Sequence, residues 1–180
     1  MSKNSTKIRN MVFLAMLVAI NVVFSRVTMI NITQNTKFSF EVIAIAFAAY
    51  VYGIGGAAIV AGLGDFVGAL LRSIQGLPYN PAYTVTAVIT GILFAVFLYR
   101  KLNLGRIIAS VLATQVLCSL LLNTFWNALF YGTKGTLWQS FVAIFSTRLV
   151  QFAIMTPLKI VLLILLVPVF KQGEKLINKR

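Results

Sequence analysis

Three ionisable side chains, those of Asp65, Arg148 and Lys159, fall inside stretches of sequence that are otherwise apolar. A charge within a membrane helix costs about 2.5 to 3.5 kcal/mol on insertion scales, so such a residue usually has a function or a partner. A carboxylate can accept hydrogen bonds from a ligand or from a neighbouring helix, and a cationic side chain can hold an anion. Binding chemistry is therefore available at these positions.

The sequence contains few of the residues that catalysis requires. The chain has no His, a single Cys (Cys118) and three acidic residues, and nothing in it resembles a nucleophile with a base and an orienting group. These counts exclude a Cys/His metal site and an internal disulfide. A phosphate-binding loop with Lys and Ser or Thr is also missing from the sequence, so ATP hydrolysis is not expected. We predict no enzyme activity, no catalytic residue, no metal and no cofactor.

The composition is that of a membrane protein. Of 180 residues, 59% are hydrophobic and 11% are charged, against about 25% charged in soluble domains. A soluble enzyme, a secreted disulfide scaffold and a disordered chain are disfavoured. The net charge of +13 does not indicate nucleic-acid binding, because the basic residues are scattered among apolar runs. The basic start followed by an apolar run is interpreted as a first membrane helix, not a cleavable signal peptide.

Apolar stretches long enough to cross a bilayer recur along the chain. They predict an all-α integral membrane protein in which residues 1–180 form a single domain of six transmembrane helices. The approximate helices are 8–25, 40–54, 56–71, 82–99, 107–130 and 139–170. The link between the second and third is the glycine-rich turn 52–56. The last helix is long, so it must tilt, bend or project, and Pro157 gives it a reason to bend.

The basic residues are shared unequally between the two predicted sides. One side holds Lys3, Lys7, Arg9, Arg100, Lys101, Arg106, Lys171, Lys175, Lys179 and Arg180, and the other holds Arg26, Lys37, Arg72 and Lys134. Because Lys and Arg accumulate in cytoplasmic loops, both termini are predicted to be cytoplasmic.

Asp65 lies between Gly64 and Gly68, which are four residues apart and allow close helix approach. Arg72 is seven residues further on, hence on the same helix face about 10 Å away. A carboxylate at depth and a guanidinium near the mouth could bind a ligand with a donor end and an anionic end. The alternative is that Asp65 bonds a neighbouring helix.

Polar residues also share faces in the last two predicted helices. Asn123 and Asn127 are four apart with Trp126 beside them, and Gln151 and Phe152 follow Arg148 by three and four residues. These residues are candidates for substrate binding. The alternatives are that the Asn pair joins helices and that Arg148 and Arg26 reach the membrane interface. Lys159 is interpreted as reaching the interface or a partner.

The predicted outer loops, 27–37, 72–81 and 131–138, are polar or rich in Gly and Pro, and could form a lidded pocket. Tyr79, Tyr83, Phe125, Trp126 and Trp138 could stack against a ligand there. Ordinary connecting loops, with Tyr79 and Trp138 as interface anchors, are the alternative. Ala15 and Ala19 form a small-xxx-small patch, where another helix can approach, within the bundle or from a partner.

These features together resemble a known family. Six short helices, the Ala-xxx-Ala patch, Gly-Asp-x-x-Gly-Ala at 64–69 and Pro-Tyr-x-Pro at 78–81 look like the substrate-binding S components of energy-coupling factor (ECF) vitamin transporters. The likeness is closest to the folate-specific members. The matching stretches are 14–26, 62–70, 77–86, 90–101, 123–126 and 147–163.

The resemblance implies a fold and a mechanism. S components are six-helix proteins of the cell membrane, here of a Gram-positive bacterium, that bind a vitamin from outside. They associate with a membrane coupling subunit and two ATPases, which bind ATP and Mg, and they topple in the membrane to deliver the substrate. Ala15 and Ala19 match the patch that docks on the coupling subunit.

A folate ligand would suit the residues described above. A flat pterin offers donors that Asp65 and the Asn123/Asn127 pair could bind, and cations such as Arg26, Arg72 and Arg148 could hold the glutamate carboxylates. Another vitamin, such as pantothenate, riboflavin or a queuosine precursor, is the nearest alternative. A stand-alone carrier or channel is a second alternative.

Overall fold

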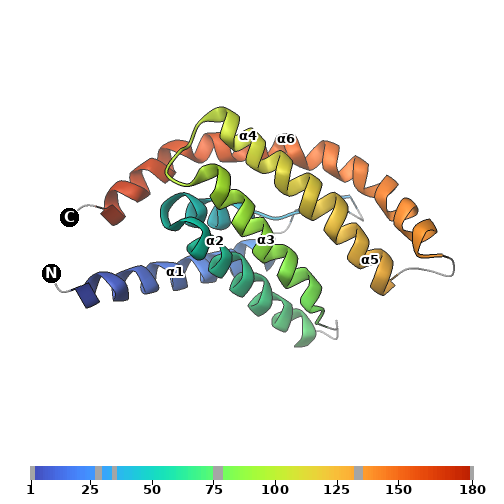
Figure 1. The fold of residues 1–180 in the computed structure, drawn as a ribbon, viewed down its shortest axis with the longest axis horizontal. Coiled ribbons are helices and arrows are strands. Elements are labelled where there is room, and N and C mark those ends of the chain that lie inside the picture. Colours follow the sequence, from blue (N-terminus) through green and yellow to red (C-terminus); the bar gives the residue numbers. More distant parts are fainter. Residues whose placement is uncertain (1–2, 27–29, 34–35, 75–78, 132–135, 179–180) are drawn as a thin grey trace. The chain divides into compact units, whose positions relative to one another are not determined.

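The computed structural model describes residues 3–26, 30–33, 36–74, 79–131 and 136–178. These residues form two compact units, Met1–Arg100 and Lys101–Arg180 (Figure 1). The first unit contains α1 (Lys3–Arg26), β1 (Ile30–Thr33), β2 (Thr36–Phe38), α2 (Glu41–Ile74) and α3 (Pro81–Leu98). The second contains α4 (Leu104–Thr114), the π-helix η1 (Gln115–Leu122), α5 (Asn123–Tyr131) and α6 (Leu137–Asn178).

The described residues include five helices that are long and apolar enough to cross a membrane, where the sequence predicts six. The difference arises in α2, in which the predicted helices 40–54 and 56–71 run on from one another. Gly53 interrupts α2 with φ 68° and ψ −153°. The helical membrane character is thus confirmed, apart from the short β1–β2 hairpin. Six spans and the single domain stay predictions.

The chain reverses at Gly53, within the predicted turn. Ala44 and Ala48 share one core cluster with Val60 and with Leu17 of α1. In a straight helix Ala44 and Val60 would be about 24 Å apart, so the two halves of α2 must fold against each other. The positive φ favours Gly, and a Cβ at this position would lie 3.0 Å from the Tyr99 ring.

Small residues bring α2 and α3 together, and the two helices run side by side in Figure 1. A Cβ on Gly91 would lie 2.6 Å from the carbonyl oxygen of Ala57. Two turns further along α2, a Cβ on Gly64 would collide with the amide of Asn21 in α1. The prediction that Gly64 permits a close helix approach is confirmed.

We expect Gly91→Ala to lower the free energy of unfolding by about 1 to 3 kcal/mol, because the added methyl group must push α3 away from the α2 backbone. Gly55→Ala is the matched control. No atom lies within 4 Å of a Cβ built there, so this change should stabilise α2 by up to about 1 kcal/mol. Thermal unfolding in detergent measures both, and equal stability of the two variants would contradict this account of α2–α3 packing.

The predicted polar loop 27–37 contains a short antiparallel hairpin instead. β1 pairs with β2 through Ile30 with Phe38, Asn31 with Lys37 and Thr33 with Thr36, with an irregularity between Asn31 and Thr33. Residues 27–29 and 34–35 lie outside the described residues.

The second unit consists of two long helical runs. The first passes from α4 through η1 into α5, so the predicted helix 107–130 is present with a π-helical middle. The second, α6, has 42 residues and extends beyond the predicted 139–170 at both ends. Its length is about 63 Å, twice the apolar thickness of a bilayer. It contains Pro157 and Pro168 and bends along its length in Figure 1, as proline-containing helices do.

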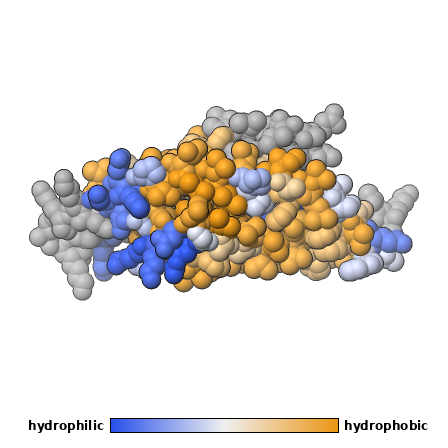
Figure 2. All heavy atoms as spheres, turned by 90° about the horizontal axis from the view of Figure 1, so that it is seen from above, coloured by the Kyte–Doolittle hydropathy of each residue, from blue (hydrophilic) through white to orange (hydrophobic). Residues whose placement is uncertain are grey.

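Large hydrophobic side chains cover much of the surface (Figure 2). On α1, for example, Ile8, Met11, Val12, Met16, Ile20 and Val23 are all exposed. Apolar surfaces of this extent are covered by lipid or by partner proteins.

Candidate functional site

A chain of three polar side chains joins α2 to the start of α3. The Thr84 hydroxyl donates to Asp65 Oδ2 at 2.8 Å, and the Tyr79 hydroxyl lies 3.1 Å from Thr84 Oγ1. All three side chains are partly exposed. A hydroxyl has a single proton, and that of Thr84 is directed to Asp65. The Tyr79 hydroxyl must therefore donate to Thr84.

The beginning of α3 is fixed by its cap. Asn80 Oδ1 accepts a hydrogen bond from the backbone N–H of Ala82 at 3.0 Å, and Pro81 occupies the first helical position, where its missing donor costs nothing. This cap places Tyr79 just before the helix and Thr84 in its first turn. The ring of Phe66, next to Asp65, meets that of Tyr79 edge to face at 5.6 Å.

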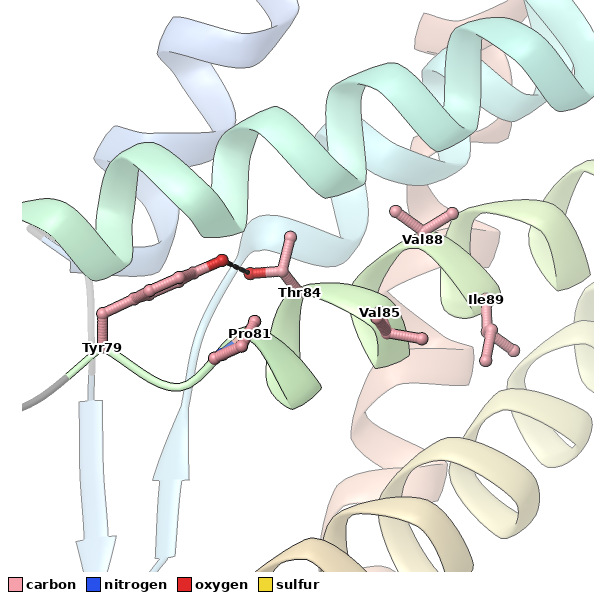
Figure 3. Close-up of a pocket in the computed structure, with 6 residues that line it drawn as sticks. All are labelled: Tyr79, Pro81, Thr84, Val85, Val88 and Ile89. Atoms are coloured by element: carbon pink, nitrogen blue, oxygen red, sulfur yellow. Dashed lines mark hydrogen bonds between the residues drawn. The ribbon is translucent and has the colours of Figure 1, made fainter.

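An open hollow of about 320 Å³ lies beside this hydrogen-bond chain (Figure 3). It is lined by Tyr79, Pro81, Thr84, Val85, Val88 and Ile89. The last three residues form an apolar wall along α3, while the hydroxyls of Tyr79 and Thr84 point toward each other at one end. Ligand sites commonly combine an apolar wall with a few polar groups in a volume of about 300 to 1,000 Å³. A flat heterocycle with polar edges suits such a surface.

The structure thus brings Asp65 and Tyr79 together through Thr84. Two roles were predicted for Asp65, ligand binding and a hydrogen bond to a neighbouring helix. The second is observed, because Oδ2 accepts from Thr84 of α3. Tyr83 is partly buried in the same turn of α3, and its backbone N–H donates to the Asn80 carbonyl at 3.3 Å.

Several predicted cations fall outside the described part of the structure. Arg26 ends α1, Lys37 lies in β2 and Arg72 lies in the last turn of α2, but their side chains are outside the described residues, as is all of Lys134. The guanidinium near the mouth of the site stays a prediction.

In the second unit, two cations of α6 contact η1. Arg148 Nη1 donates to the Ser119 carbonyl at 3.1 Å, and Lys159 Nζ donates to Gln115 Oε1 at 3.0 Å. A π-helix has a looser backbone than an α-helix and often occurs at functional sites. Of the two interpretations of Lys159, an interface position or a partner, this hydrogen bond supports the partner. The acceptors of these two hydrogen bonds, a backbone carbonyl and a side-chain amide, are neutral groups.

The two asparagines interact within their own helix. Asn127 Nδ2 donates to the backbone carbonyl of Asn123 at 2.6 Å, and Asn123 Oδ1 is buried with no donor among the described residues. Trp126 stacks on Phe130 with ring centres 6.2 Å apart. These contacts give no support to the pair as a link between helices, and they leave one buried acceptor for a ligand or water.

Two further candidates lie on α6. Gln151 is partly buried, three residues from Arg148 and on the same face. Trp138, in contrast, is 71% exposed and stacks on Phe141 at 5.9 Å. High exposure near the end of an apolar helix favours an interface anchor for Trp138.

Sequence reasoning did not single out Thr84, Gln115 or Ser119. Thr84 resembles Thr86 and Thr90 in the same helix, but those two hydroxyls donate to backbone carbonyls four residues back, at 3.1 and 2.9 Å. Residue type alone cannot distinguish the three. The only available signal was the five-residue spacing of Thr84 from Tyr79, across the start of a helix.

Ala15 and Ala19 lie on the exposed face of α1. The opposite face of this helix packs inward through Leu17 and Asn21, and Asn21 Nδ2 donates to the Val60 carbonyl at 3.0 Å. Packing of Ala15 and Ala19 against α2 is therefore not observed, and their patch is open to lipid or a partner.

Comparison with known sequences places these features in a family. The family described as "ECF transporter, substrate-specific component" matches residues 9–167, which is most of the chain. The protein therefore belongs to the substrate-specific components of ECF transporters, which are membrane transport subunits, and the family resemblance predicted from the motifs is confirmed.

Particular members are similar to this chain. The folate transporter FolT of Clostridium novyi is 29% identical over 153 residues, covering 84% of each chain. FolT of Leuconostoc mesenteroides is 29% identical over 154 residues, covering 84% of this chain and 80% of its own. A crystal structure of FolT bound with folic acid matches with a TM-score of 0.73 and 29% identity, over 85% of this chain and 89% of that one.

Proposed function

We propose that this protein is the folate-binding subunit of an ECF importer. The observation that carries the proposal is the likeness to FolT bound with folic acid, which extends over 85% of the chain at a TM-score of 0.73. Two curated folate transporters with 29% identity support the same substrate. Both come from Gram-positive bacteria, and we place this protein in the cell membrane of such an organism, with six spans and both termini cytoplasmic.

The chemistry of folate suits the polar chain in the first unit. A pterin presents adjacent N–H donors on one edge and a flat apolar face. The Asp65 carboxylate can accept from such an edge, and Val85, Val88 and Ile89 offer an apolar wall in the hollow that its partner Thr84 also lines. We propose that Asp65 binds the pterin edge, with Tyr79 at its face.

The two glutamate carboxylates require cations. We propose that Arg148, with Arg26 and Arg72, holds them, because a guanidinium binds a carboxylate through two parallel hydrogen bonds. Arg148 contacts η1 through the Ser119 carbonyl, and its guanidinium has five N–H donors in all. The remaining predicted binding residues are Tyr83, Asn123, Trp126, Asn127, Trp138 and Gln151.

Energy for uptake is proposed to come from partners, a membrane coupling subunit and two ATPases, as in the family. Proteoliposomes test this directly. The protein alone should bind folic acid without accumulating it, and accumulation should appear when the coupling subunit, both ATPases and internal ATP are added. Accumulation by this chain alone would contradict the proposal and favour a stand-alone carrier.

Arg148→Ala is expected to weaken folic acid binding by about tenfold while weakening a pterin without the glutamate tail by less than about twofold, since a charged hydrogen bond contributes about 1.5 to 3 kcal/mol. Lys159→Ala is the matched control, as it removes a second α6 cation that also contacts a neutral acceptor. Titration calorimetry gives both affinities. Equal losses for the two ligands would mean that Arg148 is structural.

A further inference from the structure

The Thr84 hydroxyl makes a hydrogen bond to another helix and not to the backbone of its own helix. Thr hydroxyls in helices commonly donate to the carbonyl four residues back, and Thr86 and Thr90 do so. Thr84 instead donates to Asp65, nineteen residues away on α2. Its hydroxyl is thereby directed at the acidic residue.

The carboxylate of Asp65 is only partly occupied. Thr84 bonds Oδ2, and Oδ1 accepts no hydrogen bond from the residues that the structure describes. A carboxylate has about four lone-pair sites, two on each oxygen. One site on Oδ2 and both on Oδ1 therefore accept no hydrogen bond from the described residues. Two adjacent N–H donors on one edge of a heterocycle would fit this pair of oxygens.

The hydrogen bonds of this network all run toward Asp65, which accepts and does not donate. Tyr79 donates to Thr84, and Thr84 donates to Asp65. A carboxylate that already receives one hydrogen bond is restrained in its orientation. Tyr79 also contacts Phe66 through its ring, which limits the positions of its hydroxyl.

We propose that Thr84 is a specificity-determining positioning residue, which holds the Asp65 carboxylate so that its two oxygens accept from two adjacent N–H donors of the ligand, as on an aminopyrimidinone edge. The naming of that ligand rests on the proposed function. Thr84 acts through Asp65, so its removal should reduce discrimination between ligand edges more than overall binding.

The test compares two ligands on the purified full-length protein in detergent. One ligand is folic acid, and the other is the analogue in which hydrogen replaces the 2-amino group. Wild-type protein is expected to prefer folic acid by about 10- to 100-fold. Thr84→Val should weaken folic acid binding by about tenfold and reduce the preference to less than about threefold. Thr84→Ser, which keeps the hydroxyl, should restore it.

Thr90→Val is the matched control, because it removes a hydroxyl of the same helix that bonds only its own backbone. It should leave both affinities unchanged. If Thr84→Val fails to fold, as judged by thermal unfolding, Tyr79→Phe carries the test, since it removes the donor to Thr84 and should lower the preference in part.

The outcomes separate this inference from the proposed function. Wild-type protein that binds no folic acid contradicts the proposed function. Wild-type protein that binds and discriminates, with a folded Thr84→Val variant that keeps the full preference, overturns the role of Thr84 alone. Equal losses for both ligands also overturn it, because they indicate a purely structural role.

Discussion

Asp65→Asn should reduce the affinity for folic acid by about 100-fold. The replacement has nearly the same shape, but it removes the negative charge and puts an amide donor where the ligand presents donors. Hydrogen bonds to a charged group contribute about 1.5 to 3 kcal/mol, and a donor facing a donor adds a desolvation cost. The Thr84 hydroxyl can still donate to the amide oxygen, so the link between α2 and α3 should survive. Titration calorimetry on the purified protein measures the loss.

Glu41→Gln is the matched control for this change. Glu41 begins α2 and is the other acidic residue of the first unit, and we give it no part in the site. Its affinity should stay within about twofold of wild type. If Asp65→Asn is folded and binds folic acid as wild type does, Asp65 does not bind the pterin edge.

Ala19→Trp, and likewise Ala15→Trp, should abolish ATP-driven uptake while sparing folic acid binding. Both alanines are exposed on α1 and lie four residues apart on one face. If the coupling subunit packs on this patch, an indole side chain would hold the two helices apart, because close approach requires small residues. The measurement is uptake of labelled folic acid into proteoliposomes that contain all partners, beside calorimetry on the variant alone.

Ile20→Trp is the control that distinguishes a block of docking from a general effect of adding a large side chain to α1. Ile20 is also exposed on α1, but it lies about 100° further round the helix than Ala19. Its uptake should stay near the wild-type rate. Normal uptake by both alanine variants would show that the coupling subunit docks elsewhere.

The apolar stretches predicted most of the fold, because membrane helices need long runs of hydrophobic residues whatever their partners. The turn at Gly53 was also predictable, since Gly accepts a positive φ that other residues rarely adopt. The count of six spans stays a prediction, because the two helices predicted at 40–54 and 56–71 form one element that is interrupted at Gly53.

Other elements left no clear signal in the sequence. The π-helix Gln115–Leu122 has the composition of an ordinary apolar helix. The β1–β2 hairpin is too short for a pattern of alternation to be recognised, and its polar residues indicated a loop. The full length of α6 could not be predicted from hydrophobicity, because its last turns are polar and charged.

The residues of the candidate site were largely predictable from the sequence, but the hydrogen bonds between them were not. Asp65 was a candidate because a carboxylate is costly among apolar residues. Tyr79 was a candidate because it lies in a Pro-rich loop. Thr84 connects them, but a hydroxyl that bonds its own backbone and one that bonds another helix look alike in sequence. Arg148 was predicted to hold an anion, whereas its contact with the Ser119 carbonyl depends on how α6 packs against η1.

Calorimetric titration of the purified protein with folic acid tests the central claim most directly. The account predicts one molecule bound per chain with a Kd of about 1 μM or lower, equivalent to about −8 kcal/mol or stronger. It also predicts much weaker binding of pantothenate and riboflavin. Absence of binding at micromolar folic acid, together with tight binding of another vitamin, would contradict the account.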